Sequence, residues 1–172
     1  MTDLARRGRY RLHGAWSEGV LIAAAVIFDC AGAAVSLLDY LFSRQDQRGA
    51  GLGAALFGAA ITDLSGRRLL VEVDSDREAS ADREIRRRRK NFYRRLGCRE
   101  LVGLPYILPL PGAGDPPLMD LMVLGETRDV VATREVGDWL LAMIGEAYPD
   151  APAEILVTRM TENLGPSIRL EP

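Results

Sequence analysis

A glycine-rich segment between an apolar strand and a small-residue helix contains the residue types that most directly suggest chemistry. The strand pattern ends at Ser43, polar residues occupy 44–48, and glycines follow at 49, 51 and 53. Glycines let a backbone approach an anion closely, and the first N–H groups of a helix have no intrahelical partner. With the positive end of the helix dipole, these groups form a cradle for a pyrophosphate. The segment therefore predicts a ligand that carries phosphate.

Three classes of phosphate ligand suit such a loop, and the residue spacing separates them. A nucleoside triphosphatase would need Gly-Lys-Ser/Thr after four spacer residues; the loop has no lysine, which excludes that class. A Rossmann fingerprint fits loosely, with Gly49, Gly51 and Ala54 as GxGxxA and Glu72 at the distance expected of a ribose ligand. Polar residues separate the strand from the first glycine, however, and the later strands do not alternate with helices. This dinucleotide class therefore ranks second, behind coenzyme A.

The apolar periodicity around the loop predicts the elements that must position it. Strands are predicted over 10–16, 20–28, 34–43, 69–73, 102–110 and 118–124. Helices are predicted over 54–64, 82–96 and 133–147. The first two strands form a hairpin, and the chain beyond residue 149 has no clear pattern. This order predicts an α+β domain with a mixed, mostly antiparallel central sheet flanked by helices.

Two of these elements carry a side-chain pattern that bears on the loop. Strand alternation predicts that one face of the third strand carries Leu37, Asp39 and Leu41. In the helix over 82–96, Ile85, Phe92 and Leu96 fall on a single stripe. The basic run 86–90 spreads around that helix, so we expect most of its charges to face water.

Two motifs in register resemble the GCN5-related N-acetyltransferase (GNAT) family. The family pattern Q/R-x-x-G-x-G/A corresponds to the run from Arg48 to Gly53, behind the strand LLDYLFS. A family helix that ends in an aromatic pair and a glycine corresponds to Phe92, Tyr93 and Gly97. The resemblance covers roughly residues 10–125. It implies an acyl-CoA N-acyltransferase-like fold, with acetyl-CoA as co-substrate and an amine as acceptor.

The resemblance also implies which residues bind the coenzyme. The pyrophosphate is expected to bind the backbone of Arg48, Gly49, Ala50, Gly51, Leu52 and Gly53, and Ala54 begins the helix. The pantetheine arm is expected to pair with the free backbone groups of Leu41, Phe42 and Ser43, which would otherwise lack hydrogen-bond partners. Arg89 lies within the apolar stripe of its helix, so its guanidinium either extends along the apolar surface to water or meets an anion such as a coenzyme phosphate.

Three residues are candidates for the chemistry of acetyl transfer. Tyr93 matches the family tyrosine that protonates the departing sulfur; its other interpretation is a core aromatic beside Phe92. A base must also take a proton from the acceptor ammonium. Asp39, an acidic residue in an apolar strand, is the first candidate, and Glu72 on the next strand is the second. Either carboxylate could instead pair with an arginine and serve the structure.

Composition bounds the remaining possibilities. The chain has 172 residues, 48% of them hydrophobic, which indicates one globular domain rather than a disordered chain. Its 22 basic and 24 acidic residues give a net charge of -2, so no surplus favours nucleic acid or a membrane. Two cysteines, Cys30 and Cys98, and the single His13 lack metal-ligand spacing, and no metal is expected. The first residues lack the apolar region of a secretory signal, which predicts a cytoplasmic location.

The sequence does not identify the acceptor or the residues that bind it. We expect one GNAT-like domain over 1–150 and a C-terminal tail over 151–172. Few residues precede the first predicted strand, where the family has a strand and two helices beside the acceptor. This predicts a shortened N-terminus, or a partner subunit, as in a homodimer, that supplies the missing wall. The acceptor is expected to be a small-molecule or peptide amine; the alternative function is a non-catalytic acyl-CoA or CoA-binding regulatory module.

Overall fold

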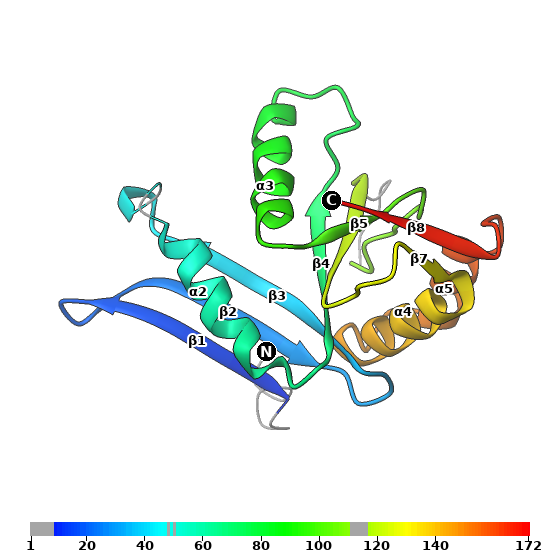
Figure 1. Cartoon of the computed structure of the whole chain (residues 1–172), viewed down its shortest axis with the longest axis horizontal. Coiled ribbons are helices and arrows are strands. Elements are labelled where there is room, and N and C mark those ends of the chain that lie inside the picture. Colours follow the sequence, from blue (N-terminus) through cyan, green and yellow to red (C-terminus); the bar gives the residue numbers. More distant parts are fainter. Residues whose placement is uncertain (1–8, 48, 50, 111–116) are drawn as a thin grey trace.

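The computed structural model describes residues 9–47, 49, 51–110 and 117–172, and these form a mixed sheet with helices on both faces (Figure 1). Strand order across the sheet is β1-β2-β3-β4-β6-β5-β8-β7. Only β3 and β4 pair in parallel among the described strands. The predicted mixed, mostly antiparallel α+β fold is therefore confirmed.

The N-terminal half supplies one wing of the sheet. It consists of β1 (Tyr10–Ser17), β2 (Val20–Asp29) and β3 (Val35–Ser43). Glu18 and Gly19 both have positive φ in the tight turn between β1 and β2, a turn that suits the twist of a hairpin. The hairpin predicted from period-two alternation is thus confirmed. A short 3-10 turn, Gln45–Gln47, follows β3.

The other wing contains five shorter strands. These are β4 (Arg68–Asp74), β5 (Arg99–Leu101), β6 (Met119–Leu124), β7 (Val130–Ala132) and β8 (Ser167–Glu171). β8, from the C-terminal residues, pairs with both β5 and β7. The predicted strand over 102–110 is wrong, because β5 ends at Leu101. Pro105 and Pro109 cannot donate ladder hydrogen bonds, so this stretch runs as an irregular segment instead.

Helices divide the apolar residues into two cores, one on each face of the sheet. On one face lie α2 (Leu52–Ile61) and α3 (Arg83–Arg95), over a core that includes Val71 and Tyr93. On the other lie α4 (Thr133–Ala147) and α5 (Ala153–Thr161), over a core that includes Leu70 and Trp139. A 3-10 turn, Thr62–Leu64, ends the α2 region. Neighbouring residues of β4 thus serve opposite cores, as strand alternation requires.

Two expected side-chain patterns are corrected by the packing. Leu37 belongs to the core under α4, whereas Leu41 packs against the core under α2, so they do not share a face. The cause is a bulge in β3: Tyr40 pairs with Val26 and Leu38 with Ile27, which leaves Asp39 unpaired. Ile85 does not join the apolar stripe of α3, because its side chain is 58% exposed.

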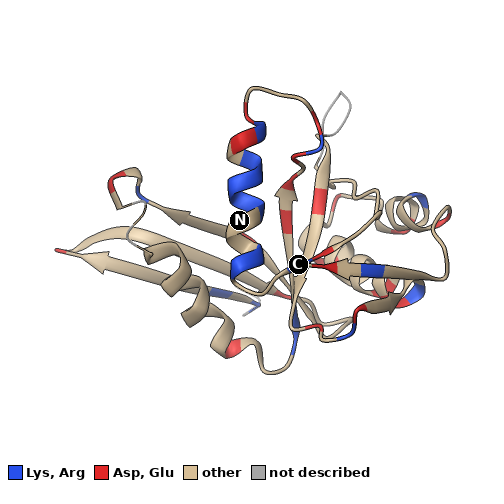
Figure 2. Ribbon diagram, turned by 45° about the horizontal axis from the view of Figure 1, so that its top comes forward, with Lys and Arg blue, Asp and Glu red and all other residues tan. Residues whose placement is uncertain are grey.

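The charged surface of α3 conceals a buried lysine that periodicity does not predict. Figure 2 shows basic residues along α3 and acidic residues on the strands nearby. Lys90 is 3% exposed and pairs with Asp120, Glu100 and Asp76. Lys90 is therefore an exception to the expectation that most of the run 86–90 faces water. Within the described ranges, no helix has both the length and the apolar character needed to cross a bilayer.

Candidate active site

The sheet opens into a wedge between β3 and β4. Their parallel ladder joins Val35 to Arg68, Ser36 to Leu69 and Leu37 to Leu70. Beyond these pairs no ladder bond joins the two strands in the described chain, and β3 continues to Ser43. Backbone groups along the inner edge of β3 are therefore available to an extended ligand.

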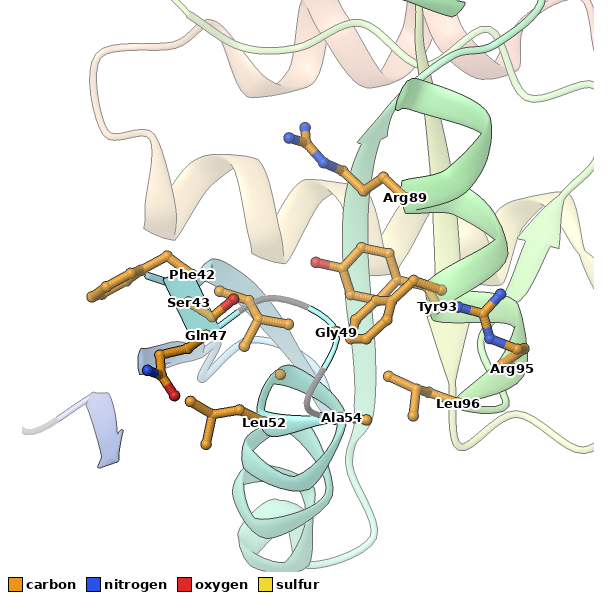
Figure 3. Close-up of a pocket in the computed structure, with 14 residues that line it drawn as sticks. Phe42, Ser43, Gln47, Gly49, Leu52, Ala54, Arg89, Tyr93, Arg95 and Leu96 are labelled. Atoms are coloured by element: carbon orange, nitrogen blue, oxygen red, sulfur yellow. The ribbon is translucent and has the colours of Figure 1, made fainter. Parts of the chain in front are cut away.

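A pocket of about 470 Å³ lies where the end of β3, the start of α2 and one side of α3 meet (Figure 3). The β3 residues in its wall are Leu41, Phe42 and Ser43. The segment leading into α2 contributes Gln47, Gly49, Gly51, Leu52, Gly53 and Ala54. The α3 side contributes Arg89, Phe92, Tyr93, Arg95 and Leu96. The pocket thus combines strand edge, helix N-terminus and aromatic side chains in one cavity.

Glycine conformation explains the start of α2. Gly51 is the N-cap with φ of 77°, and Gly49 has φ of 90°. Both values lie in the left-handed region, which any residue with a Cβ enters at a cost. No side chain caps the helix and no acidic residue lies in its first turn. The first N–H groups of α2 therefore keep their capacity to bind an anion.

Tyr93 reaches this pocket from the core. The residue is 7% exposed, and its ring packs against those of Phe57 and Phe92. In Figure 3 its hydroxyl points toward the space between α3 and the end of β3. Burial raises the pKa of Tyr93 to about 12, with the charge of Arg89 acting in the opposite direction. The phenol therefore keeps its proton at neutral pH.

Glu72 faces the other side of the sheet, because its neighbours Val71 and Val73 belong to the core under α2 and α3. Its two carboxylate oxygens accept hydrogen bonds from the hydroxyls of Tyr106 and Tyr148. Burial raises the pKa of Glu72, the two tyrosine hydrogen bonds oppose that rise, and the charge of Asp39 adds to it.

Asp39 lies near Glu72, on the bulge of β3. The residue is exposed at its surface, yet partial burial of its carboxylate raises its pKa. Among the described residues, no arginine or lysine pairs with either carboxylate, although most acidic side chains on this protein do have such a partner. The interpretation of Asp39 and Glu72 as structural partners of an arginine is thus not supported by the contacts.

Several solved structures share the fold of this chain. A protein described as an acetyltransferase of the GNAT family from Bacteroides thetaiotaomicron matches with a TM-score of 0.61 and 22% identity, over 82% of this chain and 75% of its own. An aminoglycoside 6'-N-acetyltransferase complexed with coenzyme A matches with a TM-score of 0.54 and 16% identity, over 72% and 77%. Nourseothricin acetyltransferase matches with a TM-score of 0.53 and 24% identity, over 69% of this chain and 66% of its own. The chain has the GNAT acetyltransferase fold. No protein-family model and no curated sequence matches it.

The coenzyme-binding residues expected from the GNAT resemblance can be compared with the pocket. Its walls include Leu41, Phe42, Ser43, Gly49, Gly51, Leu52, Gly53, Ala54 and Arg89. Arg48 and Ala50 lie outside the described residues. Arg89 also donates to Asp74 over 2.7 Å, and its side chain is 55% exposed. A phosphate at Arg89 would therefore share that guanidinium with an existing partner.

Four pocket residues were not expected from the sequence: Gln47, Phe92, Arg95 and Leu96. Phe92 and Leu96 lie near Tyr93 on the helix, so the same periodicity that placed them in the stripe could have pointed to them. Arg95 lines the pocket and, within the described part of the chain, pairs with no carboxylate. It is therefore a more available cation for a phosphate than Arg89.

Proposed function

We propose that this protein transfers an acetyl group from acetyl-CoA to an amine, as the GNAT fold suggests. One observation carries the proposal: the wedge between β3 and β4 lies between an uncapped helix terminus and two carboxylates that have no basic partner among the described residues. The first side suits an anionic, extended coenzyme, and the second suits a cationic acceptor. A non-catalytic coenzyme-binding module would need only the first.

The residues present fit the coenzyme. A Cβ at Gly49 or Gly51 would require a strained backbone, so the loop is built for close backbone approach. The N–H groups at the start of α2 would hold the pyrophosphate, and Arg95 is available to a further phosphate. The free edge of β3 from Leu41 to Ser43 would pair with the pantetheine amide groups. When bound, acetyl-CoA supplies a thioester whose carbonyl carbon an amine can attack.

Proton transfers fall to groups on the two sides of the wedge. Glu72 takes a proton from the acceptor ammonium, directly or through a water, because only a neutral amine is nucleophilic. Two lone-pair positions remain on its carboxylate after the tyrosine bonds are counted. Asp39 attracts the incoming cation without a fixed hydrogen bond to orient it. Tyr93 gives its hydroxyl proton to the departing sulfur.

The coenzyme assignment is tested by calorimetric titration of the purified chain with coenzyme A, acetyl-CoA and NAD. We expect both coenzyme A forms to bind and NAD to give no heat. Binding of NAD alone would replace this proposal with the dinucleotide one. A panel of small amines and peptides, followed by release of free thiol, then measures transfer. Coenzyme binding with no transfer to any amine in the panel would favour the regulatory module.

The choice of base is tested by comparing two amide variants. Glu72→Gln removes the proton acceptor and should lower kcat by about 100-fold or more. Asp39→Asn removes only the attraction and should mainly raise KM for the acceptor. The reverse pattern would assign the base to Asp39 instead. Both variants keep side-chain volume, and calorimetry with coenzyme A reports whether each remains folded.

A further inference from the structure

Tyr148 connects the C-terminal helices to the candidate base. It is the C-cap residue of α4, outside the part of the chain that carries the family resemblance. Its hydroxyl lies 2.7 Å from Oε2 of Glu72, although 76 residues separate the two. The other oxygen, Oε1, accepts from Tyr106 in the irregular segment after β5. The carboxylate is therefore held from two sides by elements that no local sequence pattern associates with it.

The end of α4 is fixed in place, which gives the Tyr148 contact a defined geometry. The carboxylate of Glu146 accepts the backbone N–H groups of Ala31 and Gly32, at 2.8 and 2.7 Å, in the turn between β2 and β3. The N–H of Tyr148 donates to the carbonyl of Ile144 over 3.0 Å, and its own carbonyl accepts from Ala151 over 2.9 Å. Helix α4 is thus anchored to the turn that precedes β3, the strand that carries Asp39.

The surroundings of Glu72 explain why two hydroxyl donors matter. The ionisable groups that face it are Tyr106, Tyr148 and Asp39, and Tyr10 lies near the last two. None of these is a cation. A carboxylate withdrawn from water without a cation or donor takes up a proton and loses its value as a base. The two phenol protons are the compensating interactions on this face of the described chain.

We propose that Tyr148 and Tyr106 are positioning residues that keep the Glu72 carboxylate ionised and oriented toward the acceptor. The α4 end thereby becomes part of the acceptor side of the active site. This inference rests on the proposed function only for its catalytic consequence. The interaction itself, a carboxylate kept ionised by two phenols, is a property of the protein without coenzyme.

The catalytic consequence is tested with Tyr148→Phe, which removes one hydroxyl and keeps the ring. Loss of a hydrogen bond to a charged group is worth about a tenfold factor. We expect kcat/KM to fall about tenfold on the acidic side of the pH profile and to change less than about twofold on its alkaline plateau. Tyr106→Phe should act in the same direction. The matched control is Tyr40→Phe, because Tyr40 is 61% exposed and makes no hydrogen bond through its hydroxyl to the described residues.

An infrared titration of the coenzyme-free protein separates this inference from the proposed function. The carbonyl band of a protonated carboxyl, assigned by its loss in Glu72→Gln, should appear at higher pH in Tyr148→Phe than in the unmodified protein or Tyr40→Phe. A band that titrates identically in all three would overturn the inference, and so would a loss of kcat/KM that is uniform with pH. A shifted band in a protein that acetylates nothing would uphold the tyrosine interaction while refuting the transferase proposal.

Discussion

Replacing Lys90 with methionine should lower the free energy of unfolding by about 3 kcal/mol, because it leaves buried carboxylates without their cation. The Lys90 ammonium lies 2.6 Å from Asp120 and 2.7 Å from Glu100, and its side chain is 4% exposed. Breaking a buried ion pair by removing one partner costs about 3–5 kcal/mol. Arg77 still reaches Asp120 and Arg94 still reaches Glu100, which places the expected cost at the low end of that range.

Urea unfolding of the coenzyme-free protein, followed by circular dichroism, measures this cost. A change of about 3 kcal/mol corresponds to a fall in Tm of roughly 6–12 °C for a domain of this size. The matched control is Arg88→Met on the same helix, where an exposed guanidinium meets Glu84 and should contribute less than about 0.5 kcal/mol. The double variant Lys90→Met/Asp120→Asn should recover part of the loss, since it removes a buried carboxylate charge that Arg77 alone would otherwise compensate.

Two results would refute this reasoning. A cost for Lys90→Met below about 1 kcal/mol, or equal to that of Arg88→Met, would mean that the carboxylates find water or other cations when the lysine is gone. A double variant less stable than Lys90→Met would mean that Asp120 contributes through Arg77 rather than suffering from the loss of Lys90.

Three further outcomes are expected. Gly51 and Gly19 both have positive φ with open space around them, so Gly51→Ala and Gly19→Ala should each cost about 1 kcal/mol of stability. Only Gly51→Ala should weaken coenzyme A binding, by about tenfold in calorimetry. Equal affinities of the two variants for coenzyme A would refute the helix-terminus cradle. Tyr93→Phe should lower kcat by about 100-fold while the Kd for coenzyme A stays within about twofold. An unchanged kcat in steady-state assays would mean that Tyr93 only packs in the core. Hydrogen bonds from Arg128, with those from Arg68, lower the pKa of Glu126, so the folded state resists a proton that the unfolded state binds as pH falls. Stability should therefore decline below the ordinary pKa of a glutamate, and urea unfolding of Glu126→Gln should show a flatter decline; parallel slopes would contradict this.

The pocket that we propose for the coenzyme could be predicted to a large extent from the sequence. Its elements are local: a strand, a loop with glycines at fixed spacing, and a helix that begins at once after them. Left-handed backbone at Gly49 and Gly51 and an uncapped helix start are properties of a few neighbouring residues. Tyr93 was proposed from the family resemblance, which rests on a short motif at the end of its helix.

The proposed acceptor side was predicted less completely, because its geometry depends on contacts between distant segments. Asp39 and Glu72 were chosen as acidic residues in apolar strands, yet nothing in the sequence showed that one lies on a bulge. The stretch 102–110 was assigned to a strand, and its actual path brings the hydroxyl of Tyr106 to Glu72. The residues after 149 lacked a clear pattern, although they form α5 and β8.

Local backbone preference and side-chain period are properties of short windows of sequence, and they determined the order of most elements and the glycine loop. The candidate acid Tyr93 came from the family resemblance. Which carboxylates remain without a cation was decided only when the chain folded. The arginines and Lys90 could have paired with many acidic partners, and packing selected Asp120 and Glu100 for Lys90 while leaving Glu72 to two tyrosines. A buried charge is stabilised by whatever surrounds it in space, and for Glu72 those surroundings come from residues 34 and 76 positions away along the chain.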